Sequence, residues 1–250
     1  MRRTGGVAWA TTPQTYTGAR MIKFYYHPSP NPAKVALLLE ETGLPYELVP
    51  VDTRKGEQFS PGYLAINPNA KTPAIVDGDV TVFDSNAILL YLAEKAGRFL
   101  PPNTPAARGE LLSWLMFVAT GVGPYTGQAF HFKHAAPEPK EYALNRYLYE
   151  AGRHWGILDA RLAKKTYVVG ESYTIVDMAV WGWVRAIPFV FGEGVWTQFP
   201  NLKRHLDEIN ARPAAKRAEA VKDRHAFKAE MDADARKFLF PHTAVNVAAG

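Results

Sequence analysis

The sequence predicts an α/β domain followed by an all-helical domain. Three observations support this organisation: strand and helix patterns alternate as far as residue 96, a proline-rich segment follows, and only helical patterns occur beyond it. We therefore expect the α/β domain over residues 21–100, a linker over residues 101–106 and the helical domain over residues 107–240.

The two ends of the chain lack a periodic pattern. Residues 1–20 contain three arginines and no acidic residue. A mitochondrial targeting segment shares this charge bias, but the stretch has no serine and no amphipathic pattern. We expect a flexible arm over residues 1–20 and a flexible tail over residues 241–250.

The first domain opens with a strand, a helix and a second strand. Ile22–Tyr26 is apolar and aromatic, as a buried strand should be. Three prolines follow it, so the helix begins only at Asn31 or Pro32, and Gly43 ends it. Tyr46–Val51 has the pattern of the second strand, and this order normally gives parallel pairing with a right-handed crossover.

The rest of the first domain predicts a hairpin and a helix. Ala74–Val76 and Val80–Phe83 are short strand patterns separated by Asp-Gly-Asp, which is a hairpin signal. Ser85–Ala96 has an apolar face with helical spacing. The order β-α-β followed by β-β-α is the thioredoxin arrangement, so we expect a thioredoxin-like domain.

Beyond the linker we expect only helices. The periodic segments are Ala106–Phe132 with a bend near Gly121, Glu141–Leu162, Thr174–Ile187, Pro200–Asn210 and Ala214–Phe238.

Composition excludes several kinds of chemistry. The chain has no cysteine, which excludes disulfides, thiolate metal sites and a protein thiol as nucleophile. Any sulfur chemistry must therefore come from a bound small molecule. The net charge is +5, but acidic and basic residues are interleaved, and no apolar run is long enough to span a bilayer. We expect a cytoplasmic protein with no nucleic-acid or membrane partner.

Ser29 lies in the turn between the first strand and the first helix. A hydroxyl there is beside the positive end of the helix dipole and the unpaired N–H groups, where a thiolate would be stabilised. The alternative is that Ser29 and Asn31 only cap the helix, a common role for both residue types.

Lys71, Thr72 and Pro73 directly precede the third strand. Proline is tolerated at the first residue of a strand. If the Thr72–Pro73 bond is cis, the main chain of Thr72 can pair with an extended peptide ligand. A trans turn without such a role is the commoner alternative.

Asp84 and Ser85 open the last helix of the first domain. The Ser85 hydroxyl and the first N–H groups can hold a carboxylate, and Asp84 can pair with an ammonium group. Ordinary capping by either residue is the alternative. Thr174 and Asp177 have the spacing of a capping box, which we interpret as structural.

Three motifs together carry a resemblance that none of them carries alone: "TPAIVDGD", "FDSNAILLYLAE" and "GESYTIVDMA". From Ile22 to about Arg217 the chain resembles the soluble glutathione transferases. The turn "PSPNPAKV" and the segment "KGEQFSPGYLAINPNAKTPAIV" resemble most the bacterial Nu class and its Ure2-like fungal relatives. The turn of that class usually has threonine where this chain has Ser29, which keeps the hydroxyl.

The resemblance implies two roles at the centre of glutathione. Ser29 and Asn31 would hydrogen-bond the sulfur and lower the pKa of the thiol, so that thiolate is present near neutral pH. Thr72 would pair its main chain with the cysteinyl unit beside cis-Pro73.

It also implies contacts at the two ends of the ligand. Asp84 and Ser85 would hold the γ-glutamyl end, and Gln58 and Lys71 would reach the glycyl end. Arg146, in "NRYLYE", would also approach the ligand.

The activity implied is that of a homodimeric enzyme that uses glutathione or glutathione disulfide. It would add glutathione to a small electrophile or reduce a disulfide, with glutathione itself as the attacking thiolate. The aromatic residues of the helical domain suggest an apolar acceptor pocket, although a helical core would use the same residues: Trp114, Phe117, Tyr125, Phe130 and Phe132.

Several alternatives stay open. Tyr26, near the end of the first strand, is the rival activator of the thiol. His131 and His134 lack a third ligand at metal spacing, so we expect no metal site. The protein could also be a non-catalytic ligand carrier or protein-interaction module of the same fold, or a structural domain that has lost glutathione.

Overall fold

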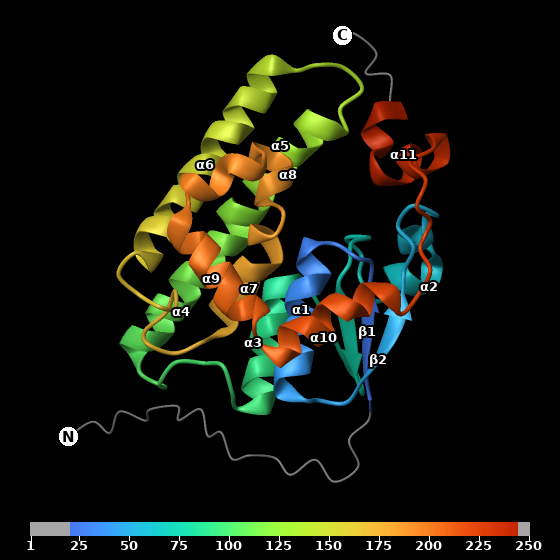
Figure 1. The fold of residues 1–250 in the computed structure, drawn as a ribbon. Coiled ribbons are helices and arrows are strands. Elements are labelled where there is room, and N and C mark those ends of the chain that lie inside the picture. The colour runs from blue at the N-terminus through green and yellow to red at the C-terminus, as the bar shows by residue number, and fades with distance from the viewer. Residues whose placement is uncertain (1–20, 245–250) are drawn as a thin grey trace, which may run out of the picture.

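The computed structural model describes residues 21–244. Its first domain contains a mixed four-stranded sheet in the order β2-β1-β3-β4, with β1 parallel to β2 and antiparallel to β3. The strands are β1 (Ile22–Tyr26), β2 (Tyr46–Pro50), β3 (Ala74–Asp77) and β4 (Val80–Phe83). The thioredoxin-like arrangement predicted from the sequence is confirmed (Figure 1).

Every second side chain of β1 is buried, because helices cover the sheet. Ile22, Phe24 and Tyr26 are buried and belong to the main core. That core includes the helices α1 (Pro30–Thr42) and α3 (Ser85–Ala96), which pack against each other. The short helix α2 (Pro61–Leu64) belongs with a smaller cluster that contains Tyr63, Val51 and Ala74.

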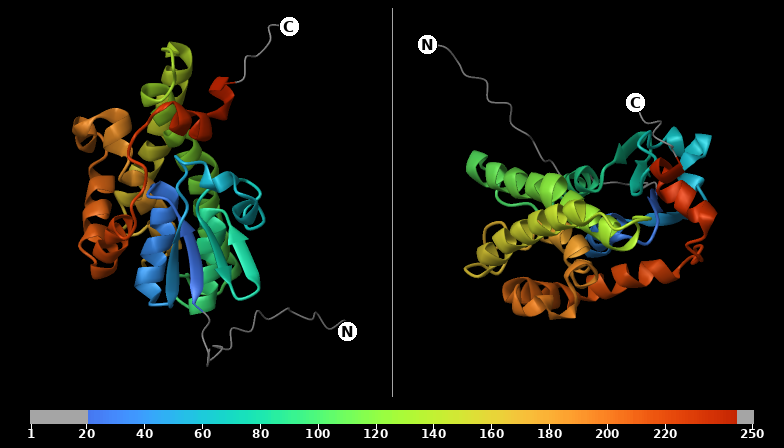
Figure 2. Two further views of the ribbon diagram at one scale, coloured as in Figure 1. Left: turned by 90° about the vertical axis from the view of Figure 1, so that its right-hand side faces the viewer. Right: turned by 90° about the horizontal axis from the view of Figure 1, so that it is seen from above.

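The second domain is all-helical, as predicted (Figures 1 and 2). Its helices are α4 (Pro105–Phe117), α5 (Gly123–His134), α6 (Glu141–Leu162), α7 (Ile175–Val184), α8 (Ile187–Phe191), α9 (Pro200–Asn210), α10 (Pro213–Ala220) and α11 (Ala233–Leu239). Since α4 begins at Pro105, the linker predicted over residues 101–106 overlaps its first turn.

The bend predicted near Gly121 is a π-helical turn, Val118–Val122, between α4 and α5. A side chain at Gly121 would overlap the imidazole of His154 on α6. The glycine therefore allows the bent segment to lie close to α6.

Two of the predicted helices are interrupted. The segment Thr174–Ile187 is not one helix, because α7 ends at Val184. Pro188, near the start of α8, has no backbone N–H and would interrupt a continuous helix. The segment Ala214–Phe238 is also wrong as one helix. Residues 224–232 form no helix and run along the first domain before α11 begins.

Helix α7 joins the two domains. It is almost entirely buried and packs against α1. A β-carbon at Gly182 would lie 2.5 Å from the carbonyl oxygen of Pro30 and 2.5 Å from Cγ of Lys34. Only glycine therefore lets α7 approach the start of α1 this closely.

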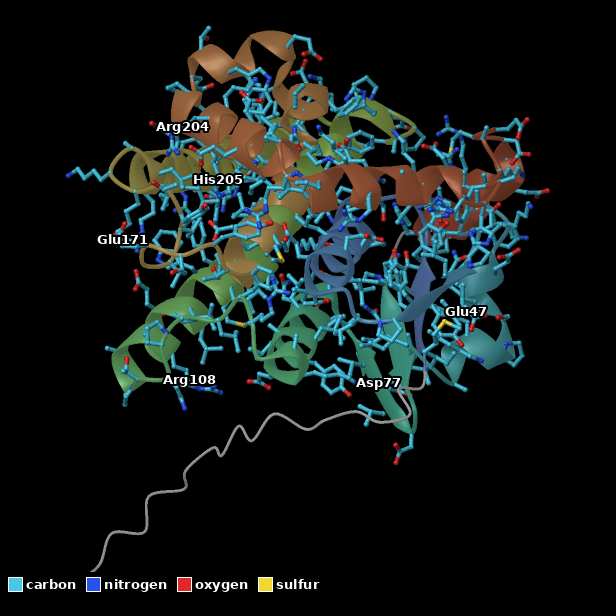
Figure 3. All side chains as sticks on the ribbon, turned by 60° about the horizontal axis from the view of Figure 1, so that its bottom comes forward. Glu47, Asp77, Arg108, Glu171, Arg204 and His205 are labelled. Carbon is cyan, nitrogen blue, oxygen red and sulfur yellow. The ribbon has the colours of Figure 1, made fainter. Side chains whose placement is uncertain are left out.

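The capping box at the start of α7 is confirmed. The carboxylate of Asp177 accepts hydrogen bonds from the backbone N–H of Thr174 at 2.8 Å and of Val168 at 2.9 Å. Nε2 of His205, labelled in Figure 3, lies 3.0 Å from the same carboxylate. Its role is structural, since all of these groups are buried in the helical domain.

Residues 224–240, which we call the C-terminal strap, return to the first domain (Figure 1). The buried carboxylate of Asp52 accepts a hydrogen bond from Lys228 N at 2.7 Å. The guanidinium of Arg54 donates to the carbonyl oxygens of Lys228 and Ala229, at 3.0 and 2.6 Å.

The arm predicted over residues 1–20, and residues 245–250 of the predicted tail, lie outside the described residues. Pro241–Ala244 forms a short 3-10 turn. Within residues 21–244, no helix is both long and apolar enough to cross a membrane.

Candidate active site

Ser29 lies at the mouth of α1 with its hydroxyl exposed. It occupies the N-cap position, but among residues 21–244 its side chain makes no capping bond, and Oγ donates to the carbonyl oxygen of His27 alone, at 3.3 Å. The capping alternative therefore does not account for Ser29. The hydroxyl is available to a ligand beside the positive end of the helix.

Asn31 does not cap α1 either. Its Oδ1 accepts hydrogen bonds from the indole Nε1 of Trp183 at 2.9 Å and from Oγ of Ser85 at 3.4 Å. Asn31 is thus bonded to the start of α3 and to α7 of the helical domain.

The Thr72–Pro73 bond is cis, and Thr72 precedes β3. Thr72 lies beyond the last pair of the β1–β3 ladder, Tyr25 with Ala74. The carbonyl oxygen of Lys71 accepts hydrogen bonds from Tyr63 Oη and Asn67 Nδ2, both at 2.6 Å, while its side chain is exposed.

Asp84 adopts an uncommon backbone conformation, with φ 70° and ψ 124°. Positive φ at a non-glycine residue costs about 1–3 kcal/mol and is frequent at functional sites. Its Oδ1 accepts hydrogen bonds from the backbone N–H groups of Asn86 at 2.9 Å and Ala87 at 3.1 Å. Asp84 therefore caps α3, as the alternative interpretation had it.

Ser85 does not cap α3 but faces a buried lysine that the sequence analysis missed. Nζ of Lys34 donates to Oγ of Ser85 at 3.2 Å and to Oδ1 of Asn86 at 3.5 Å. Burial lowers the pKa of Lys34 to about 7, against the opposing effect of the Asp84 carboxylate. The signal in the sequence was that Lys34 is the one charged residue in the run Pro28–Leu39.

Gln58 is buried beneath the C-terminal strap rather than open to the cleft. Its Nε2 donates to the carbonyl oxygens of Thr53 at 3.1 Å and Phe238 at 3.5 Å. Its Oε1 is buried and has no hydrogen-bond partner among residues 21–244. The Phe238 ring also covers Gly56, where a β-carbon would lie 2.6 Å from it.

Arg146 lies on α6 and pairs with Glu150, with 2.7 Å between Nη1 and Oε1. Within the described part of the chain, the structure connects neither Arg146 nor Gln58 to the group formed by Ser29, Asn31 and Ser85.

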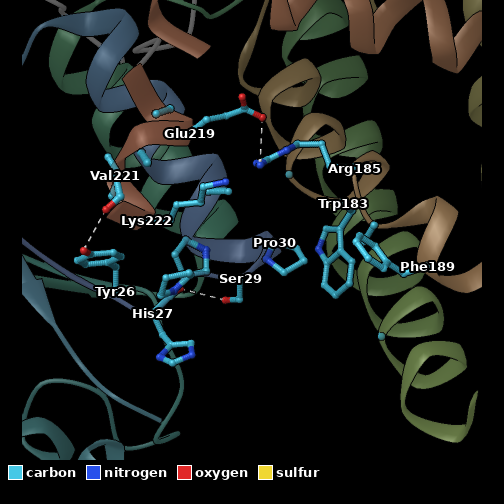
Figure 4. A pocket seen from close by; sticks show the side chains of 18 of the residues that line it. Tyr26, His27, Ser29, Pro30, Trp183, Arg185, Phe189, Glu219, Val221 and Lys222 are labelled. Atoms are coloured by element: carbon cyan, nitrogen blue, oxygen red, sulfur yellow. Dashed lines mark hydrogen bonds and ion pairs between the residues drawn. The ribbon is translucent and has the colours of Figure 1, made fainter. Parts of the chain in front are cut away.

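Tyr26 points away from Ser29 (Figure 4). Its hydroxyl donates to the carbonyl oxygen of Val221 at 3.2 Å and lies 2.9 Å from Nδ1 of His225. Burial raises the pKa of this phenol. A phenol held in this way is poorly suited to activate a thiol at the mouth of α1.

A cavity of about 530 Å³ opens beside Ser29, between the first turn of α1 and the helical domain (Figure 4). Pro28 and Pro30 line one side, and Trp183 and Phe189 line the other. The ion pair between Arg185 and Glu219, at 3.2 Å, borders it. The lining is mainly apolar, as expected of an acceptor pocket.

Of the five aromatic residues predicted to form this pocket, only Phe130 lines it. Trp114 and Phe117 pack against each other and the core, and Tyr125 packs on His154. Phe132 stacks on Tyr147 at 5.4 Å. For these four residues the open alternative holds instead: they pack among the helices, because α6 covers that side of α4 and α5.

Comparisons with known proteins agree with this geometry. Residues 19–94 match the model of the glutathione S-transferase N-terminal domain, and residues 116–213 match that of the C-terminal domain. Disulfide-bond oxidoreductase YfcG of Escherichia coli is 42% identical over 212 residues, which cover 79% of this chain and 94% of that protein. Disulfide-bond oxidoreductase YghU of the same organism is 39% identical, over 82% of this chain and 76% of that one.

Solved structures with bound ligands are also similar. A glutathione transferase from Pseudomonas putida, with one glutathione disulfide per subunit, is 35% identical with a TM-score of 0.73, over 79% of this chain and 90% of that one. One from Burkholderia graminis, with two glutathione molecules per subunit, is 37% identical with a TM-score of 0.77, over 82% and 90%. Ure2p in complex with glutathione is 29% identical with a TM-score of 0.76, over 80% and 98%.

Proposed function

Because this chain belongs to the glutathione S-transferase family, we propose that it is an enzyme that holds glutathione as a thiolate at the mouth of α1. The observation that carries the proposal is the exposed Ser29 hydroxyl, which is not used for capping and lies beside an apolar cavity. A donor to the charged form of a thiol lowers its pKa.

Thiolate formation is the step to which these residues contribute. An ordinary thiol has a pKa of about 8.5, so a lowering by about two units makes thiolate the main form at neutral pH. Ser29 Oγ–H and the positive end of α1 stabilise the negative sulfur. Asn31 supplies a second polar group from the first turn of α1.

The thiolate then reacts in one of two ways. It attacks a small electrophile in the cavity, so that a carbon–sulfur bond forms and the leaving group departs with the bonding electrons. Alternatively it attacks a disulfide, which gives a mixed disulfide and releases the other sulfur as a thiolate. The chain has no cysteine, so glutathione is the attacking thiol in both reactions.

The names of two relatives, both disulfide-bond oxidoreductases, favour disulfide reduction. The apolar cavity beside Ser29 favours a small apolar acceptor and is compatible with conjugation. Product analysis with a model disulfide and a model aryl electrophile separates the two activities.

The remaining ligand contacts complete the proposal. Thr72 pairs its main chain with the cysteinyl unit, while Asp84 and Ser85 hold the γ-glutamyl end at the start of α3. The glycyl end reaches toward Lys71 and Gln58, and contact with Gln58 requires the C-terminal strap to move, since Phe238 covers that residue. Arg146, on α6, also approaches the ligand in this proposal.

We also propose that the protein is a cytoplasmic homodimer of the Nu class, with the domain boundaries given above. The turn "PSPNPAKV" supports the class. Exposed apolar side chains on β4 and α4, Val80, Phe83 and Met116, support a dimer surface. Sedimentation at micromolar concentration tests the dimer.

A titration of bound glutathione tests the function. Thiolate absorbs in the ultraviolet, so the pKa of the bound thiol is measured directly against free glutathione. We expect a pKa well below that of the free thiol. An unshifted pKa with normal binding would favour a non-catalytic ligand carrier, and failure to bind would mean that the site has been lost.

A further inference from the structure

Asn31 lies where three elements meet: α1, α3 and α7. Its Oδ1 accepts one hydrogen bond from Trp183 on α7 and one from Ser85 on α3. A carboxamide oxygen has two lone pairs, so these donors use its full accepting capacity. The oxygen side of the amide is therefore turned toward the protein.

The chemistry of tryptophan fixes this orientation. An indole N–H is a donor and cannot accept a hydrogen bond. If the Asn31 amide turned over, its Nδ2 hydrogens would face the Trp183 N–H, and that donor would lose its acceptor. The arrangement with Oδ1 toward Trp183 is the one that satisfies both groups.

The second donor is held in place from behind. Ser85 Oγ accepts a hydrogen bond from the buried amino group of Lys34 at 3.2 Å, which leaves its hydroxyl hydrogen to donate to Asn31. A donor to the hydroxyl oxygen polarises the hydroxyl and strengthens the hydroxyl's own donation. Lys34, Ser85 and Trp183 thus act on one amide.

Nδ2 of Asn31 is left as an outward donor. Among residues 21–244 this nitrogen has no hydrogen-bond partner. It is also not buried, so it is accessible to a ligand. Ser29, two residues earlier, presents its hydroxyl at the same mouth of α1, with Trp183 across the cavity (Figure 4).

We propose that Trp183 is a positioning residue that, together with Ser85, holds the Asn31 amide so that Nδ2 donates to the glutathione sulfur. This inference rests on the proposed function and adds the atom that binds the sulfur and the residue that orients it. It also gives the helical domain a part in thiol activation, since Trp183 belongs to α7.

Trp183→Phe tests the inference, because it keeps an aromatic ring and removes the N–H donor. We expect the pKa of bound glutathione thiol to rise by about one unit, a tenfold loss in its acid dissociation constant. Glutathione affinity, measured at a pH where the thiol is protonated, should change much less.

Trp181→Phe is the matched control. It lies on the same helix, and its indole Nε1 donates to Oδ1 of another asparagine, Asn210, at 2.8 Å. Since Asn210 is the last residue of α9 and not part of the mouth of α1, this variant should leave the thiol pKa unchanged.

Asn31→Asp gives an independent readout if Trp183→Phe fails to fold. The carboxylate keeps two acceptors for Trp183 and Ser85 but puts an oxygen in place of the donating Nδ2, so the thiol pKa should rise further.

The outcomes separate the two proposals. An unshifted thiol in the wild type would overturn the proposed function. A lowered pKa in the wild type that persists in Trp183→Phe would overturn the positioning role alone. If only Asn31→Asp can be studied, a thiol pKa equal to that of the wild type in this variant would overturn the positioning role.

Discussion

At the scale of single residues, Ser29 is the group on which turnover should depend most. Ser29→Ala removes a donor to a charged sulfur, a bond worth about 1.5–3 kcal/mol. We therefore expect kcat to fall about tenfold to a hundredfold while glutathione affinity changes little. Steady-state kinetics with glutathione varied measure both quantities.

Two further variants are to be compared with that result. Ser29→Thr keeps the hydroxyl and should keep most of the activity. Ser85→Ala should weaken glutathione binding, because Ser85 is proposed to hold the γ-glutamyl end, and should also raise the thiol pKa, because Ser85 donates to Asn31. If Tyr26→Phe is the damaging change and Ser29→Ala is not, the assignment of the sulfur contact is wrong.

Lys34 makes a separate prediction about the pH dependence of stability. Burial lowers its pKa to about 7 in the folded protein, whereas an unfolded lysine titrates near 10.4. Between these values the unfolded chain binds a proton that the folded protein does not, so this residue makes the free energy of unfolding rise with pH. The variant Lys34→Met has no titrating amine at this position and therefore lacks this pH-dependent contribution.

Above pH 7, the free energy of unfolding of the wild type should therefore increase relative to that of Lys34→Met by about 1 kcal/mol per pH unit. Unfolding by denaturant measures this difference. Lys216→Met, at an exposed position on α10, should show no such slope. Parallel curves for wild type and Lys34→Met would contradict the burial of a titrating amine.

The sequence predicted these residues unequally, for physical reasons. Local patterns are informative at the boundaries of helices and strands, which is where four of the predicted residues lie: Ser29, Asn31, Asp84 and Ser85. The structure places Ser85 against Asn31, in the first turn of α1 next to Ser29. Gln58 could not be placed, because Phe238, which covers it, is 180 positions away in the chain.

At the scale of elements, the contact between α1 and α7 sets the geometry of the site. Gly182→Ala would put a methyl group 2.5 Å from the Pro30 carbonyl oxygen, at the turn that carries Ser29 and Asn31. We expect a loss of about 2–3 kcal/mol in the free energy of unfolding, typical of overpacking. Chemical denaturation measures it.

Gly156→Ala is the matched control for that change. Gly156 is inside α6, and a β-carbon there meets no atom within 4 Å. Alanine should stabilise the helix by about 0.5–1 kcal/mol. Equal effects of the two substitutions would mean that α7 does not press on α1.

The strands were predictable because each is a short apolar run between clear turn signals. The helix breaks were less so. Pro188 signals the end of α7, but the unwinding of residues 224–232 comes from tertiary hydrogen bonds to Asp52 and Arg54. No local pattern contains that information.

At the scale of the whole molecule, the C-terminal strap fastens the end of the chain to the first domain. Burial alone would raise the pKa of Asp52, but hydrogen bonds from Lys228 N and Arg54 N outweigh it and lower that pKa. Stability from this carboxylate is thus present above about pH 4 and is lost as the pH falls through the folded value.

Asp52→Asn should loosen the strap at neutral pH, because an amide nitrogen would replace one of the two accepting oxygens. We expect hydrogen exchange over residues 226–232 to become about fivefold to thirtyfold faster, as for a local loss of 1–2 kcal/mol. Asp79→Asn, at an exposed hairpin position, is the control. Unchanged exchange in both variants would show that Asp52 does not hold the strap.

The account depends most on where the sulfur of glutathione lies. A crystal structure of the complex with reduced glutathione measures this directly. We predict the sulfur within hydrogen-bonding distance of Ser29 Oγ and Asn31 Nδ2, at the mouth of α1. A sulfur bound at Tyr26, or a cleft that stays empty at saturating glutathione, would contradict the account.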